Sequence, residues 1–188
     1  MAISTIKEDY HTRIAYYNEE LRAEILREQE LVRDFERALE EGQIKMYLQP
    51  QMSATGELLG TEALVRWEHP EKGAIQPGEF IPVFEKNGFI TKLDLHIYEE
   101  VCKLKASWKG TKYEHIPVSV NMSRLHLYDR VFPERLEAIA KRYEVDLPEL
   151  EMEITESTFV KDSDELIAVV SKLKEKGFLV SIDDFGTG

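Results

Sequence analysis

Oxygen-bearing side chains recur at the ends of short apolar runs that are typical of β-strands. Asn121 ends a Val-Ser-Val run, Glu153 lies at the end of the next such run, and the paired acids Asp183 and Asp184 end a third. In a parallel α/β protein the carboxyl ends of strands face the ligand site, whereas a carboxylate in the middle of a buried strand is costly. We therefore expect these side chains to converge.

A further strand carries an acid and a base. Residues 58–67 read as a strand whose alternation places Glu62, Leu64 and Arg66 on one face. Ala63, Val65 and Trp67 fall on the other face, which has the character of a core. The strand therefore presents a carboxylate and a guanidinium to one common surface.

This set of oxygen donors is what hard divalent cations require. Mg²⁺ prefers carboxylate, amide and water oxygens, and adjacent aspartates can share two ions between them. Two such ions favour displacement at phosphorus, because they activate water and neutralise charge on phosphoryl oxygens. For any single acid, a helix N-cap is an equally good interpretation. For acids at several successive strand ends, the metal interpretation is favoured.

Composition excludes several classes of protein. The 188 residues carry 24 Lys and Arg against 36 Asp and Glu, a formal charge of −12, which disfavours binding to a nucleic-acid polymer. No apolar run reaches the length of a membrane-spanning helix and no leader pattern begins the chain, so we expect a cytoplasmic protein with no membrane insertion. The single cysteine, Cys102, excludes an internal disulfide and multi-thiolate zinc sites. The five histidines show no spacing typical of metal ligands.

The first forty residues differ from the rest. Residues 5–41 contain no Gly or Pro and many charges, which predicts one long helix ending at Gly42. A spacing of four and three residues joins six apolar positions in this helix: Ile14, Leu21, Ile25, Val32, Phe35 and Leu39. The pattern fits a helix lying on its own domain and, equally, a dimerising or signal-transmitting coiled coil.

The rest of the chain alternates strands and helices. A strand at residues 44–48 and the strand at 58–67 predict an antiparallel hairpin, followed by a short helix at 81–86 and a longer one at 92–108. An apolar stripe predicts that the longer helix buries one face, formed by Leu93, Ile97, Val101, Leu104 and Trp108. Strand and helix then alternate, with strands at 117–121, 150–154 and 178–183 and the last helix starting near Asp162. A spacing of about 30 residues is typical of βα units, and thus of an α/β barrel or a doubly wound sheet. The absence of a glycine-rich phosphate loop disfavours the nucleotide-binding open sheet.

Six motifs, in order along the chain, resemble one known family, the EAL domain. They are Tyr47-Leu-Gln-Pro, Glu62-Ala-Leu-Val-Arg-Trp, Phe80-Ile-Pro, Val120-Asn-Met-Ser, Glu153-Ile-Thr-Glu-Ser and Asp183-Asp-Phe-Gly-Thr-Gly. The resemblance runs from about Phe35 to the last residue. It implies a modified (β/α)₈ barrel with an antiparallel first strand, and hydrolysis of cyclic di-GMP to linear pGpG with two Mg²⁺ or Mn²⁺ ions.

The resemblance also implies a role for each matching residue. The first metal ion would be held by Glu62, Asn121, Glu153 and Asp183. Asp183 would bridge to the second ion, which Asp184 would bind. Arg66 would pair with a substrate phosphate, and Gln49, Leu64 and Ser123 would line the dinucleotide pocket. Glu156 would anchor the loop after Asp184, which in the family couples dimerisation to metal binding.

The resemblance divides the chain into a connector helix, residues 1–41, and the N-terminal portion of an EAL domain, residues 42–188. Five barrel strands can be read where a closed barrel of about 250 residues has eight. Three later positions of the family, a lysine, a glutamate and a glutamine, have no counterpart here. We therefore expect a fragment of a longer product, or strands supplied by another chain, and weak or no activity of the chain alone.

Two functions remain open at this point. One is a cyclic di-GMP phosphodiesterase, and the other is a binding or regulatory module that holds cyclic di-GMP or a partner domain without turnover. The connector resembles those that join an upstream sensory or GGDEF-type domain, and a homodimer is the other expected partner.

Overall fold

The computed structural model describes residues 19–155 and 163–183. Helix α1 (Glu19–Glu40) precedes a hairpin of β1 (Ile44–Met52) and β2 (Leu58–His69), the short strand β3 (Gly73–Ile75), and the helices α2 (Pro77–Asn87) and α3 (Ile90–Trp108). Then come β4 (Val118–Asn121), the 3₁₀ helix η2 (Arg124–Tyr128), α4 (Phe132–Arg142), the 3₁₀ helix η3 (Leu147–Glu149), β5 (Leu150–Thr155), α6 (Ser163–Lys176) and β6 (Leu179–Asp183). The predicted order of strands and helices is confirmed, with β3 and the two 3₁₀ helices as additional elements.

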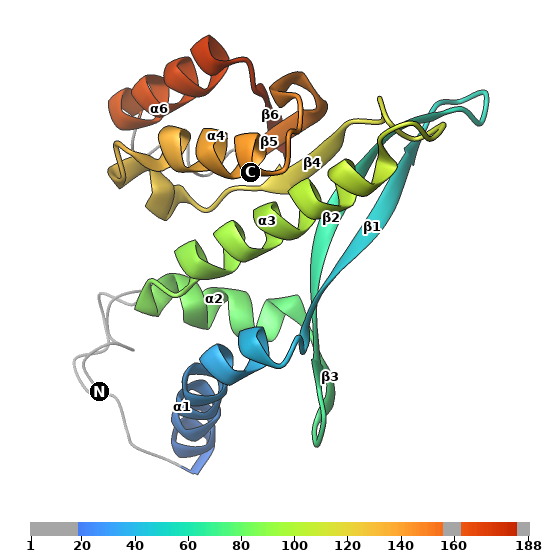
Figure 1. Ribbon diagram of the computed structural model, residues 1–188. Coiled ribbons are helices and arrows are strands. Elements are labelled where there is room, and N and C mark those ends of the chain that lie inside the picture. The colour runs from blue at the N-terminus through green and yellow to red at the C-terminus, as the bar shows by residue number, and fades with distance from the viewer. Residues whose placement is uncertain (1–18, 156–162, 184–188) are drawn as a thin grey trace.

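The strands form one sheet in the order β1-β2-β4-β5-β6, with β3 paired to β2. Strand β1 runs antiparallel to β2, whereas β2, β4, β5 and β6 are mutually parallel. Figure 1 shows α2, α3, α4 and α6 on one side of this sheet. The arrangement is that of one part of an α/β barrel wall, with the antiparallel first strand that the sequence predicted.

Two features between β2 and α3 differ from the sequence prediction. Residues 73–75 form β3, which pairs with Trp67 to His69 of β2. The helix expected at 81–86 begins earlier, at Pro77, because Gln76 and Glu79 form a reciprocal capping box and proline is favoured in a first turn. It ends at Gly88, whose positive φ of 78° suits a residue without a side chain.

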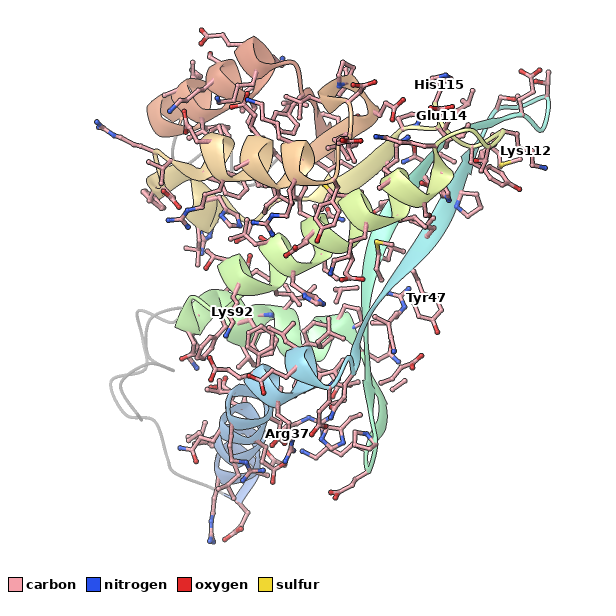
Figure 2. The ribbon with its side chains drawn as sticks, in the orientation of Figure 1. Arg37, Tyr47, Lys92, Lys112, Glu114 and His115 are labelled. Carbon is pink, nitrogen blue, oxygen red and sulfur yellow. The ribbon has the colours of Figure 1, made fainter. Side chains whose placement is uncertain are left out.

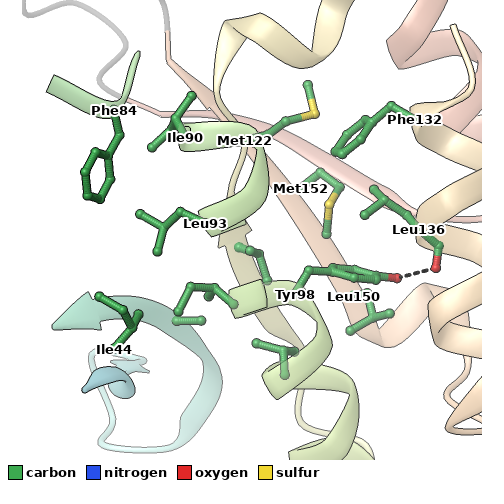
Figure 3. Packing of buried hydrophobic residues seen from close by; sticks show 14 of the residues in the cluster. Ile44, Phe84, Ile90, Leu93, Tyr98, Met122, Phe132, Leu136, Leu150 and Met152 are labelled. Atoms are coloured by element: carbon green, nitrogen blue, oxygen red, sulfur yellow. Dashed lines mark hydrogen bonds between the residues drawn. The ribbon is translucent and has the colours of Figure 1, made fainter. Parts of the chain in front are cut away.

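The core lies between the sheet and its helices. Figure 3 shows part of it, where Leu93 and Tyr98 of α3 pack near Met152 and Leu150 of β5. The Tyr98 hydroxyl donates to the Leu136 carbonyl of α4 at 3.1 Å, so the one polar atom of this buried ring is satisfied. Helix α3 is therefore the central helix against which the strands and α4 pack.

Helix α3 also buries a charge that the apolar stripe did not predict. Lys105 is 3% exposed, and its Nζ lies 2.8 Å from Glu149 Oε2. The same Nζ donates to the carbonyls of Glu114 and Ile116. Leu104 and Trp108, expected on the buried stripe, are only half-buried. The buried ammonium thus ties α3 to the segment before β4 and to η3.

The described part of α1 lies on its own domain. Leu31, Phe35 and Ala38 are buried, and the Phe35 ring lies 4.4 Å from that of Phe84 in α2, centroid to centroid. This favours the first interpretation of the connector for its second half. Leu21 remains half-buried, and Ile14 lies outside the described residues, so a second partner for the first half stays a prediction.

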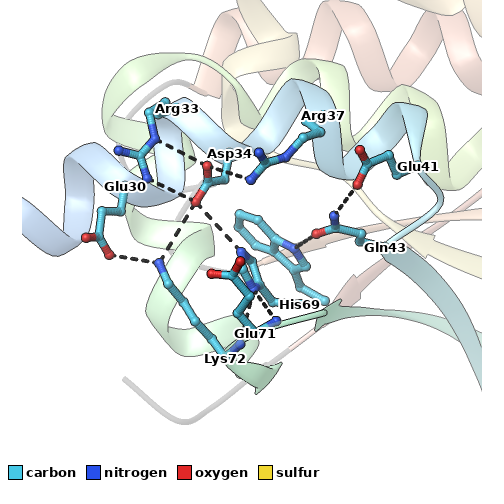
Figure 4. Close-up of polar contacts among 10 residues, drawn as sticks. Glu30, Arg33, Asp34, Arg37, Glu41, Gln43, His69, Glu71 and Lys72 are labelled. Atoms are coloured by element: carbon cyan, nitrogen blue, oxygen red, sulfur yellow. Dashed lines mark hydrogen bonds and ion pairs between the residues drawn. The ribbon is translucent and has the colours of Figure 1, made fainter.

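Polar contacts complete the docking of α1. Figure 4 shows Asp34 of α1 facing His69 at the end of β2 and Lys72 in the β2–β3 turn, with Arg33 and Arg37 on either side.

The predicted helix start near Asp162 lies outside the described residues, and α6 is described from Ser163. None of the helices within residues 19–155 and 163–183 could span a lipid bilayer.

Candidate functional site

Strand β2 presents its acid and its base on the face away from the helices. Ala63 and Trp67 are buried in the core, whereas Glu62, Leu64 and Arg66 are half-buried on the opposite face. Side chains alternate along a strand, so the predicted sharing of one face is confirmed.

Strand β1 adds polar side chains to the same face. Its register places Gln49 opposite Glu62 and Tyr47 opposite Leu64. Figure 2 shows Tyr47 projecting from β1 away from α2 and α3. The Tyr47 hydroxyl donates to Glu68 Oε1 at 2.9 Å, and this hydrogen bond to a carboxylate raises the pKa of the tyrosine. Tyr47 therefore stays a neutral donor that links the two strands.

The amide of Asn121 contacts the Glu62 carboxylate. Asn121 Nδ2 donates to Glu62 Oε1 at 2.9 Å, which leaves the amide oxygen as an acceptor. The parallel register places Asn121 opposite Glu153 on the next strand. Oxygen donors from β2, β4 and β5 thus share one face of the sheet, as the sequence pattern predicted.

The remaining predicted metal ligands are described less fully. Strand β6 places Asp183 opposite Thr155, at the carboxyl end of the neighbouring strand. The side chain of Asp183 and the whole of Glu156 and Asp184 lie outside the described residues. Their roles as ligands and as loop anchor stay predictions.

The donor chemistry fits a hard divalent ion. Within residues 19–155 and 163–183 no group of three or more His, Cys, Asp or Glu side chains is placed to hold a metal. The structure places the Asn121 amide of β4 between two carboxylate residues of the neighbouring strands, Glu62 of β2 and Glu153 of β5. Carboxylate and amide oxygens are ligands for Mg²⁺ or Mn²⁺ rather than for softer metals.

Arg66 supplies a cation to the same face. Its Nη1 donates to the carbonyl of Val65 at 2.9 Å, which orients the guanidinium. Among the described residues no carboxylate forms an ion pair with Arg66. A half-buried guanidinium without an acidic partner is suited to bind a phosphate through its planar set of donors.

A cavity of about 440 Å³ lies beside these groups. Its walls come from β2, α2, α3 and the segment after β4. They include two of the predicted pocket residues, Leu64 and Ser123, together with Arg66 and Asn121. Gln49, Glu62 and Glu153 are not among its lining residues. The cavity therefore lies between β2 and the helices α2 and α3, to one side of Glu62 and Glu153, and Arg66 is among the residues that line it.

The sequence analysis missed several residues at this cavity. Glu85, Asp94 and Arg124 line it, and Asp94 accepts a hydrogen bond from His126. One signal could have found Asp94. It lies between Leu93 and Ile97 on the apolar stripe of α3, where an unpartnered carboxylate would be costly.

Comparisons with known proteins agree with this geometry. Residues 32–188 match the family model described as EAL domain. The chain belongs to the EAL domain family. The predicted EAL-type fold is thereby confirmed, and the match includes all six motifs of the sequence analysis.

Two curated relatives come from Pseudomonas aeruginosa. This EAL chain is 32% identical over 174 residues to the bifunctional diguanylate cyclase/cyclic di-GMP phosphodiesterase MucR, covering 92% of the chain and 25% of MucR. It is 36% identical over 152 residues to the cyclic di-GMP phosphodiesterase PA2567, covering 79% of the chain and 25% of that protein. The chain thus spans about a quarter of the length of these relatives.

A solved structure is similar as well. The MucR phosphodiesterase in a cyclic di-GMP complex is 34% identical with a TM-score of 0.79, over 85% of this EAL chain and 65% of that one. A chain of this identity and overlap shares the arrangement of strands on which Glu62, Asn121 and Glu153 lie.

Proposed function

We propose that this EAL chain carries the substrate-binding and first metal-binding half of a phosphodiesterase that hydrolyses cyclic di-GMP to linear pGpG. The observation that supports it most is the contact of Asn121 with Glu62 on the strand that also carries Arg66, which has no ion-pair partner within residues 19–155 and 163–183. Two relatives described as cyclic di-GMP phosphodiesterases share 32% and 36% of the aligned residues.

The residues divide into ion-binding and substrate-binding groups. Glu62, Asn121, Glu153 and Asp183 would hold one Mg²⁺ or Mn²⁺ ion, with Asp183 shared and Asp184 for the second. Such ions supply an activated water and neutralise charge at phosphorus when bound. The chain as a whole carries −12 and repels an anionic substrate, so a local excess of positive charge is required at this face.

The substrate groups orient the dinucleotide. Arg66 would form a charge-assisted contact with one phosphate, and Leu64 and Ser123 would contact the nucleoside from the cavity wall. Gln49, exposed on β1 opposite Glu62, would contact the substrate from the other side. Holding the phosphodiester between Arg66 and the acids places it for in-line attack.

The test is a hydrolysis assay with Mg²⁺ or Mn²⁺, run on this chain and on any longer natural protein that contains it. We expect metal-dependent pGpG in the active form, and a loss of at least 100-fold for Glu62→Ala, because the ion loses a ligand. Glu57→Ala, an exposed acid in the β1–β2 turn, is the matched control and should retain activity. Absence of product from every form with Mn²⁺ would contradict the proposal.

A binding module is the second candidate. It is favoured by the cavity with Leu64, Arg66 and Ser123 on its wall, which needs no second ion to receive a nucleotide. Calorimetry with cyclic di-GMP in Ca²⁺ separates the two: binding with no pGpG in Mn²⁺ supports this module, and unmeasurable affinity contradicts it. The upstream sensory or GGDEF-type partner, like a homodimer, remains a proposal that follows from the position of α1.

A further inference from the structure

A half-buried acid and a buried histidine lie behind the predicted pocket residue Ser123. Asp94 projects from α3, and its Oδ2 accepts the Ser123 backbone N–H at 3.1 Å. The same oxygen lies 2.9 Å from His126 Nε2, which donates to it. The side chain of His126 is 2% exposed and that of Asp94 is 15% exposed. One carboxylate oxygen therefore holds two donors from a single short segment.

The histidine ring is itself fixed. It stacks on Phe132 of α4 with centroids 3.8 Å apart and an interplanar angle of 19°. Its backbone N–H donates to the Ser123 carbonyl at 3.1 Å, which closes the first turn of η2. A residue held by ring packing, by one side-chain hydrogen bond and by one backbone hydrogen bond keeps its neighbours in a narrow range of geometry.

The segment held in this way, residues 121–126, contacts the predicted metal ligands and also lines the cavity. Its first residue, Asn121, contacts Glu62, and Met122 donates its N–H to the Glu153 carbonyl at 2.8 Å. Two residues after Asn121, the Ser123 hydroxyl accepts the Leu125 N–H and lies 3.5 Å from Glu85 Oε1 at the cavity. A displacement of Ser123 would therefore move a cavity wall and, through the backbone, the Asn121 amide.

We propose that Asp94 and His126 are positioning residues for cyclic di-GMP: together they hold the segment after β4 so that Ser123 and Asn121 are set for the ligand. The inference rests on the proposed function, because it assigns the ligand. Neither residue needs to touch the substrate. The role depends on the hydrogen bond between the imidazole and the carboxylate, which a glutamine of suitable reach can replace in part.

The experiment compares His126→Leu, His126→Gln and Asp94→Ala with the unchanged chain. Cyclic di-GMP affinity is measured by calorimetry in Ca²⁺, and the exchange rate of the Ser123 amide is measured by NMR without ligand. We expect His126→Leu and Asp94→Ala to raise Kd at least tenfold and to speed exchange of the Ser123 amide. His126→Gln should stay within about threefold of the unchanged Kd, because it can still donate to Asp94. Folding of each variant is checked by circular dichroism.

The molecule offers a matched control in His69, which is also buried and also faces a buried aspartate, Asp34, but contacts α1 instead of the cavity. His69→Leu should lower the melting temperature and leave Kd within twofold. An equal loss of affinity in His69→Leu and His126→Leu would overturn the positioning role, since the effect would then be one of global stability. Unchanged Kd in His126→Leu and Asp94→Ala would overturn it too and leave the proposed function standing. No binding by the unchanged chain contradicts the proposed function itself, and with it the role that rests on it.

Discussion

Two pairs of aspartate and histidine lie largely buried in different parts of this domain. In the first, Asp34 of α1 faces His69 at the end of β2, and in the second, Asp94 of α3 faces His126 of η2. The His126 pair is a hydrogen bond of 2.9 Å, whereas His69 Nε2 stays 3.7 Å from Asp34 Oδ2. His69 Nδ1 instead accepts the backbone N–H groups of two residues in the β2–β3 turn. Identical residue types thus make different contacts.

The charges around the two carboxylates also differ, and the pKa values of Asp34 and Asp94 are shifted in opposite directions. Burial tends to raise the pKa of Asp34, but Arg33, Arg37 and Lys72 outweigh it and the pKa is lowered overall. Burial raises the pKa of Asp94, and the opposing contributions of His126 and the Ser123 N–H do not overcome it. The three cations around Asp34 stabilise its charged form, so the Asp34 pair is a structural contact that helps to hold α1 on the domain. A carboxylate with few compensating charges is instead typical of a functional site.

The largest expected effect on the free energy of unfolding concerns the docking of α1 on α2. Replacing Phe35 by Ala removes a ring with no exposed surface from the contacts with Phe84 and Phe89. We expect the free energy of unfolding to fall by about 3–5 kcal/mol, from lost burial and the cavity left behind. Urea denaturation followed by circular dichroism measures it.

Leu26→Ala on the same helix is the control for this change. Leu26 is 50% exposed, so its truncation should cost well under half as much. Equal losses at the two positions would show that α1 is not docked by the Phe35 side. Because Phe35 is not itself among the residues that line the cavity, the folded fraction of the variant should retain its affinity for cyclic di-GMP.

The two aspartates should respond to pH in opposite directions. A lowered pKa means that Asp34 contributes stability above its unfolded pKa of about 3.9, and that this contribution is lost as pH falls through the folded pKa. A raised pKa means that Asp94 favours the folded state below about 3.9, and that this contribution is lost as pH rises through its folded pKa.

Urea unfolding of Asp34→Asn and Asp94→Asn between pH 3 and 7 tests this contrast. Relative to the unchanged chain, Asp34→Asn should lose about 1.5–3 kcal/mol at pH 7, since charge-assisted hydrogen bonds disappear, and less at pH 3. The deficit of Asp94→Asn should instead shrink as pH rises. Parallel pH profiles for the two variants would contradict the difference in environment.

The smallest expected effect concerns the exposed ion pairs that join α1 to its neighbours. Lys92 Nζ lies 2.8 Å from Glu36 Oε1, and both side chains are largely exposed. Lys92→Ala should cost about 0.2–1 kcal/mol in dilute buffer and almost nothing in 1 M NaCl, because salt screens exposed charges. Lys45, which forms no ion pair among the described residues, is the control. A loss at Lys92 that persists in high salt would assign its effect to packing instead.

Periodicity explains how much of this fold could be predicted. The alternation that separates Glu62 from Ala63 and the apolar stripe of α3 are local patterns, and the antiparallel β1 follows from the short turn after it. The acids at strand ends followed from the same logic, since the register of Asn121 with Glu153 is set by parallel pairing. These features need only the neighbouring residues and a period of two or 3.6.

Other features depended on contacts between distant segments. Strand β3 exists because residues 73–75 meet β2, and a three-residue run has no periodicity to read. Lys105 and Asp94 lie on an apolar stripe that argues against charged residues. Their burial is possible because Glu149 pairs with Lys105 and His126 with Asp94, and both partners come from distant parts of the sequence.

The amino-acid sequence by itself determined the order of elements and the face on which Glu62, Asn121 and Glu153 lie, because local hydrophobic patterns encode both. The tertiary structure alone decided which buried charges are paired and which of the two histidines supports the site, because the free energy of a buried charge depends on partners that sequence distance does not reveal.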